Sequence, residues 1–153
     1  MTKEPAIPPA PRGGAGAHAL RVAALSPPVS NPHYERLGGE AAVRHLVERF
    51  YQLMEELPQA HTLRAMHPRE LTHAKERLFM FLSGWLGGPP LYAERYGPPR
   101  LRRAHAAFPV DAAARDAWMD CMTRALDEQV SDPALRAELR SSFSRTAAFL
   151  RNR

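Results

Sequence analysis

The chain has 153 residues, of which 44% are apolar, and a net charge of +5. This length suits one domain with a sizeable core, and the apolar content is typical of a globular protein rather than a disordered one. No apolar run approaches the roughly 20 residues of a membrane span, and the start of the chain lacks a secretion signal. The charges are mixed in sign, so we expect no nucleic-acid partner. The single cysteine, Cys121, cannot form an internal disulfide, which fits a cytoplasmic protein.

Residues 1–30 are rich in proline and glycine. Such a composition can neither propagate a helix nor pair as a central strand. We therefore expect a disordered or loosely packed extension at 1–30 and one folded domain at 31–153.

The first half of that domain predicts one short and two long helices. A short helix over 33–37 ends at Gly38, and a long one over 40–57 has apolar residues at helical spacing. Pro58 ends the long helix, and 59–69 is expected to be a turn-rich link. A second long helix over 70–86 stops at Gly87, and 91–100 is expected to be irregular because of its prolines and glycines.

The second half predicts a short helical segment bearing His105 and then two more long helices. Asp111 is a suitable N-cap for a helix over 112–129. Asp132 followed by Pro133 opens the last helix, over 133–151. No stretch alternates cleanly between apolar and polar residues, so the fold class is all-α.

His105 and Trp118 flank the break at Pro109 and could face one pocket. A neutral imidazole is a good iron ligand, and an indole N–H is a hydrogen-bond donor with no acceptor capacity. This pairing suits haem carrying a bound diatomic ligand. Taken alone it is weak, because a single histidine near an apolar segment is more often a surface or core residue.

Several motifs recur in this order in one known family. They are Gly38-Gly39, Arg49-Phe50-Tyr51, Met66-His67-Pro68, the run Glu76 to Leu82, Gly87-Gly88-Pro89, Pro99 to Arg102, His105 to Phe108, and Arg115 to Trp118. In these motifs the chain resembles a truncated haemoglobin of the second group over roughly residues 31–153. The resemblance implies a two-over-two helical sandwich around one haem b.

The resemblance also implies roles for individual residues. His105 matches the proximal iron ligand. Trp118, Tyr51 and His67 match the distal positions that donate hydrogen bonds to a bound ligand. The position of the usual distal histidine of ordinary globins is held here by Ala74, which cannot donate.

Further residues are expected to line the haem. The apolar wall of the pocket is expected to comprise Phe50, Ala74, Leu78, Phe81, Phe108 and Met122. The haem propionates need cationic or hydroxyl partners, and the candidates are Arg77, Arg103, Tyr92 and Tyr96.

The leading functional hypothesis is a haem protein that reversibly binds dioxygen, nitric oxide or carbon monoxide. A polar distal cluster implies slow dioxygen release, which fits redox chemistry such as nitric oxide dioxygenation, with an unidentified electron donor, better than bulk delivery. The first alternative is a peroxidase-like enzyme acting on peroxide. The second is a cofactor-free helical module that binds an acidic partner through Arg100, Arg102 and Arg103. We expect a monomer or homodimer.

Overall fold

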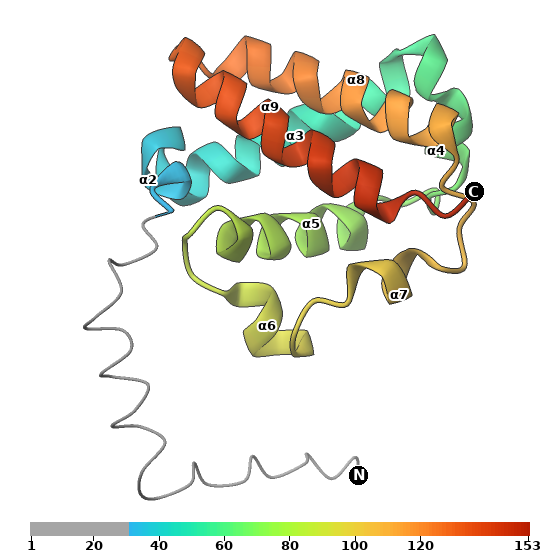
Figure 1. The fold of residues 1–153 in the computed structure, drawn as a ribbon, viewed down its shortest axis with the longest axis horizontal. Coiled ribbons are helices and arrows are strands. Elements are labelled where there is room, and N and C mark those ends of the chain that lie inside the picture. The colour runs from blue at the N-terminus through green and yellow to red at the C-terminus, as the bar shows by residue number, and fades with distance from the viewer. Residues whose placement is uncertain (1–30) are drawn as a thin grey trace, which may run out of the picture. The chain divides into compact units, whose positions relative to one another are not determined.

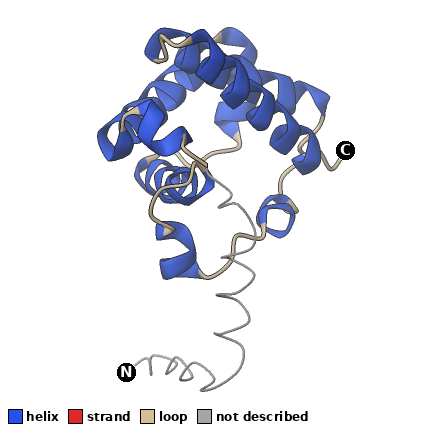
Figure 2. Cartoon of the chain, turned by 60° about the vertical axis from the view of Figure 1, so that its left-hand side comes forward, coloured by secondary structure: helices blue, strands red, loops and turns tan. Residues whose placement is uncertain are grey.

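The computed structural model describes residues 31–153, and the extension expected at 1–30 lies outside the described residues. The described part consists of helices joined by loops and contains no strand (Figure 2). Its elements are α2 (His33–Leu37), α3 (Gly39–Glu56), the 3-10 helix η1 (Pro58–Ala60), α4 (His61–Ala65), α5 (Thr72–Trp85), α6 (Leu91–Tyr96), α7 (Leu101–His105), α8 (Ala112–Gln129) and α9 (Pro133–Leu150).

The four long helices form the predicted two-over-two sandwich (Figure 1). Helix α3 packs against both α5 and α8, and α8 packs against α9. The apolar spacing read from the sequence of α3 is the face that this packing buries, as Val43, Leu46 and Phe50 are fully buried. Cys121 is also fully buried, as a small apolar side chain of α8.

Both aspartates predicted as N-caps do cap their helices. The Asp111 side chain accepts a hydrogen bond from the backbone N–H of Ala114 at 2.8 Å. The Asp132 side chain accepts one from Ala134 at 3.0 Å, with Pro133 in the first turn of α9. A cap of this kind stabilises a helix by about 1 kcal/mol.

Two segments expected to lack helices contain short ones. The link predicted at 59–69 holds η1 and α4, and the segment at 91–100 holds α6. Both predictions were wrong because we took proline as a sign of irregular structure. Pro58 instead begins η1 and Pro90 is the N-cap of α6, positions where proline is tolerated. Gly97, at φ 82°, then ends α6.

The end of α5 lies tightly against the start of the described chain. The Tyr34 N–H donates to the Leu86 carbonyl at 2.9 Å. A β-carbon on Gly87, whose φ is 94°, would lie 2.0 Å from the Asn31 carbonyl oxygen, and one on Gly88 would lie 2.5 Å from the Tyr34 ring. Only glycine therefore fits at these two positions without displacing their neighbours.

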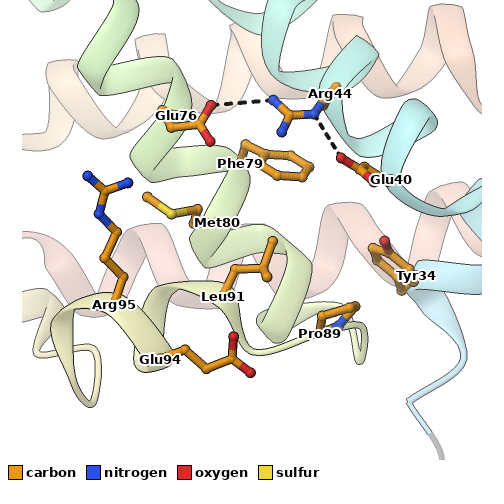
Figure 3. A pocket seen from close by; sticks show the side chains of 10 residues that line it. All are labelled: Tyr34, Glu40, Arg44, Glu76, Phe79, Met80, Pro89, Leu91, Glu94 and Arg95. Atoms are coloured by element: carbon orange, nitrogen blue, oxygen red, sulfur yellow. Dashed lines mark hydrogen bonds and ion pairs between the residues drawn. The ribbon is translucent and has the colours of Figure 1, made fainter.

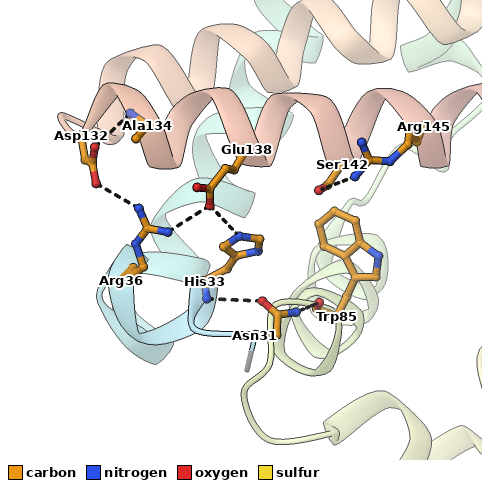
Figure 4. Close-up of polar contacts among 9 residues, drawn as sticks. All are labelled: Asn31, His33, Arg36, Trp85, Asp132, Ala134, Glu138, Ser142 and Arg145. Atoms are coloured by element: carbon orange, nitrogen blue, oxygen red, sulfur yellow. Dashed lines mark hydrogen bonds and ion pairs between the residues drawn. The ribbon is translucent and has the colours of Figure 1, made fainter. Parts of the chain in front are cut away.

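A surface cluster of charged side chains joins α2 to α9 (Figure 4). Glu138 accepts hydrogen bonds from His33 at 3.1 Å and from Arg36 at 3.0 Å, and Arg36 also pairs with Asp132 at 3.2 Å. The hydrogen bond from His33, and to a smaller extent the one from Arg36, lowers the pKa of the Glu138 carboxyl. Exposed pairs of this kind contribute little to stability, so the cluster mainly fixes the orientation of α2.

Candidate functional site

The three predicted distal residues lie in one aromatic cluster, although they come from α3, α8 and the segment after α4. The ring of Tyr51 meets that of His67 edge-on at a centroid distance of 5.9 Å. Phe50 lies 5.0 Å from Tyr51 and 5.1 Å from Trp118, and so joins the two donors. The structure thus brings together residues that are up to 67 positions apart in the sequence.

The polar atoms of this cluster are available for hydrogen bonding. The Tyr51 hydroxyl has only a long contact, 3.4 Å, to the Ala74 carbonyl, whereas strong bonds of this type are near 2.7–2.8 Å. Burial raises the pKa of Tyr51 to about 12, so its phenol keeps its proton at neutral pH. Trp118 is partly buried, and its indole N–H has no acceptor among residues 31–153.

His105 ends α7 with one ring nitrogen occupied. Its Nδ1 lies 2.7 Å from the Leu101 carbonyl oxygen, an acceptor, so this nitrogen carries the proton. In the neutral imidazole Nε2 then keeps its lone pair, the form in which histidine binds a metal. His67 has the same arrangement, with Nδ1 2.9 Å from the Leu63 carbonyl oxygen.

Asn152 holds the segment that follows His105. Its side-chain amide donates to the carbonyls of His105 at 3.2 Å and of Phe108 at 3.0 Å. Its side-chain oxygen accepts from the Val110 N–H, and its own N–H donates to the Val110 carbonyl, both at 2.9 Å. The sequence analysis missed this residue because no local pattern links it to a segment more than forty positions away.

The predicted pocket residues divide into two groups by exposure. Phe50 and Met122 are fully buried in the core. Ala74, Leu78 and Phe81 of α5 are only partly buried, although they pack against the core, and Phe108 is 43% exposed. Apolar surface that the chain itself leaves uncovered fits a large flat apolar group such as haem.

Three of the four predicted propionate partners gather at α5 and α6. The guanidinium of Arg77 lies 5.7 Å from the centre of the Tyr96 ring, which lies 5.0 Å from that of Tyr92. Arg103 is exposed on α7 and makes no hydrogen bond or ring contact with these three within the described residues.

A separate hollow of about 450 Å³ lies between α3, α5 and α6 (Figure 3). Arg44 lies over the Phe79 ring there at 3.8 Å and pairs with Glu40 and Glu76, both at 3.3 Å. None of the predicted site residues lines this hollow. Its central arginine is already paired with two carboxylates, which leaves Glu94 and Arg95 as the charged lining residues without an ion pair among the described residues.

The sequence analysis did not single out Trp85 or Phe143. In the structure the Phe143 ring lies between the two tryptophans of the chain, with its centroid 5.7 Å from that of Trp118 and 4.7 Å from that of Trp85. Helical spacing predicts that such residues are buried, but not which rings meet across helices.

Comparison with known proteins identifies the family. A model of the bacterial-like globins matches residues 32–152. The group 2 truncated haemoglobin YjbI of Bacillus subtilis is 35% identical over 122 residues, which are 80% of this chain and 89% of that protein. The chain belongs to the group II truncated haemoglobins.

Solved structures agree with this assignment. The cold-adapted truncated haemoglobin of the Antarctic bacterium Pseudoalteromonas haloplanktis is 43% identical, with a TM-score of 0.78 over 79% of this chain and 98% of that one. The group II 2-on-2 haemoglobin of Agrobacterium tumefaciens is 42% identical, with a TM-score of 0.76 over 78% of this chain and 93% of that one. The resemblance inferred from the sequence motifs is therefore confirmed.

Membership of the family makes this chain a haem-binding globin for small gaseous ligands. Within residues 31–153 no group of three or more His, Cys, Asp or Glu side chains could hold a metal ion by itself. None of the helices in that range has the length and apolar character that crossing a membrane requires.

Proposed function

We propose that this truncated haemoglobin binds haem b through Nε2 of His105 and holds dioxygen tightly for redox chemistry rather than for bulk delivery. The observation that carries the proposal is the cluster of Tyr51, His67 and Trp118, in which Phe50 joins two potential donors, Tyr51 and Trp118, and His67 packs edge-on against Tyr51. Haem, held by His105, would supply an iron atom that can bind diatomic ligands.

The residues of the chain set the conditions around that ligand. The Trp118 indole N–H and the Tyr51 hydroxyl, both without a strong partner among residues 31–153, can donate to a ligand that gains negative charge. The apolar side chains of Leu78 and Phe81 exclude water, which strengthens these hydrogen bonds. Arg77, Tyr92 and Tyr96 would hold the propionates, with Arg103 as a further candidate.

Slow release of dioxygen suits a reaction such as the conversion of nitric oxide to nitrate, with an electron donor returning the iron to its ferrous state. The Bacillus subtilis relative whose structure is solved is described as a truncated oxygen-avid haemoglobin. It is 35% identical to this chain, which supports the same property here. A cofactor-free module for an acidic partner has no support in the family.

A spectroscopic experiment tests the proximal ligand. The purified protein should show an intense haem band and, when ferrous with carbon monoxide, the spectrum of a histidine-ligated haem. His105→Gly should lose or alter this spectrum, and added imidazole should restore it. His61→Gly, which removes an exposed histidine at the start of α4, is the matched control and should behave as the wild type. A normal spectrum in His105→Gly would refute the assignment.

A further inference from the structure

An aromatic path runs from the distal cluster to the surface. Trp118 belongs to the cluster through its contact with Phe50. The buried Phe143 ring connects Trp118 to Trp85, with centroid distances of 5.7 and 4.7 Å. Trp85 lines a hollow at the surface. The proposed ligand site therefore communicates with the outside through an unbroken series of aromatic rings.

The hollow at the end of this path has a volume of about 310 Å³. It is lined by Asn31, His33, Trp85, Ser142, Arg145 and Thr146. Figure 4 shows the Trp85 ring beside Ser142 and Arg145 of α9. The volume is at the small end for a ligand pocket, so it suits a molecule with a single ring.

The charges around the hollow favour an anion. Arg145 donates hydrogen bonds to the Ser141 and Ser142 hydroxyls, at 2.9 and 3.2 Å, and pairs with no carboxylate within the described residues. Glu138, which contacts His33 of the lining, is also held by Arg36. A guanidinium bound only to neutral hydroxyls retains its capacity to bind a carboxylate.

We propose that this hollow binds a phenolic carboxylate, and that the series Trp85, Phe143 and Trp118 conducts its electron toward haem oxidised by hydrogen peroxide. The carboxylate would pair with Arg145, and the phenol ring would lie against Trp85. Indole gives up an electron more readily than a benzene ring does. The two tryptophans are therefore oxidised transiently, and the electron passes between them through Phe143. This inference rests on the haem binding proposed above.

One turnover consumes one hydrogen peroxide and two phenols. Hydrogen peroxide takes up two electrons and two protons, its O–O bond breaks, and two water molecules form. Two phenols are bound and oxidised in succession. Each gives one electron through Trp85 and one proton from its hydroxyl group, and leaves as a phenoxyl radical.

The path is tested by locating the radical. The haem-loaded protein is treated with hydrogen peroxide and a nitrone spin trap, and the trapped residue is identified by peptide mass spectrometry. We expect an adduct on Trp85 in the wild type. It should be lost in Phe143→Leu, which removes the bridging ring, and in Trp118→Phe, which removes the inner tryptophan. A Trp85 adduct unchanged in both variants, or radicals trapped only at Tyr96, would overturn the path.

The haem absorption band, recorded for every variant, separates this inference from the proposed function. A variant that keeps the band but loses the Trp85 adduct supports the path. If the wild type shows no haem band after reconstitution, the proposed function itself fails. Phe143→Leu leaves a cavity in the core, so Trp118→Phe provides the second variant if that protein does not fold.

The binding site is tested with two probes that compete with the spin trap for the radical. In the wild type, 4-hydroxycinnamate should suppress the Trp85 adduct. In Arg145→Gln the concentration for half-suppression should rise about tenfold, the effect of losing one charge-assisted hydrogen bond. For the uncharged 4-methylphenol, the concentration for half-suppression should be the same in Arg145→Gln as in the wild type. Arg140→Gln removes an exposed arginine from the same helix and should change neither value. Equal behaviour of Arg145→Gln and Arg140→Gln would refute the anion site.

Discussion

Replacing Trp118 by phenylalanine should accelerate dioxygen dissociation about tenfold to a hundredfold. Phenylalanine can keep the ring contacts with Phe50 and Phe143, now at 5.1 and 5.7 Å, but it has no N–H. Since no acceptor in residues 31–153 engages the indole, its hydrogen bond is available to the ligand. A bond to a group that carries charge contributes about 1.5–3 kcal/mol, which corresponds to that range of rates.

Stopped-flow displacement of dioxygen by carbon monoxide measures this rate. Trp85→Phe is the matched control, because it makes the same change on the other side of Phe143 and should leave the rate unchanged. Reorientation of Tyr51 could mask the loss, so Trp118→Phe is also measured together with Tyr51→Phe, and the double mutant reports their coupling. Rates within twofold of wild type in both Trp118→Phe and the double mutant would refute the role of the indole.

Two further predictions concern stability and the proximal segment. Burial raises the pKa of Tyr51 from 10.0 to about 12. The protonated phenol therefore contributes its full share to the free energy of unfolding below pH 10. This share, about 2–3 kcal/mol, is lost as the pH rises toward 12. Urea unfolding should therefore show a smaller decline in Tyr51→Phe over this range, and equal declines would contradict the buried phenol. Asn152→Ala removes the donors to the His105 and Phe108 carbonyls, a loss of about 1–3 kcal/mol. It should hasten haem transfer to apomyoglobin, and an unchanged transfer rate would show that Asn152 does not hold the proximal segment.

The long helices could be predicted because each carries its own signals in sequence. The apolar spacing in α3 and the caps Asp111 and Asp132 act within a few residues, so reading the chain locally was enough. The short helix α2 was predicted from the glycine that ends it, whereas η1, α4 and α6 were missed because they are too short for a periodic pattern and lie in stretches that contain proline.

The site was predicted only as a set of residues matched to family motifs. The packing of side chains from different parts of the chain decides which rings meet. It brings Tyr51 against His67 and places Phe50 between Tyr51 and Trp118. The Phe143 bridge and the Asn152 contacts depend on pairs that are distant in the sequence. No local pattern encodes such pairs, so they became visible only in three dimensions.

The close fit of Gly87 and Gly88 against Asn31 and Tyr34 makes helix α5 asymmetric in its freedom to move. Its C-terminal end is held by these contacts, whereas its first turn begins at Thr72, and the N-cap residue Leu71 makes no side-chain capping bond. Outward motions of α5 should thus pivot at Gly87 and Gly88 and be largest at the other end of the helix, near Ala74. Gas molecules would then enter past that small side chain, and backbone amides in the first turn should exchange with deuterium sooner than those in the last.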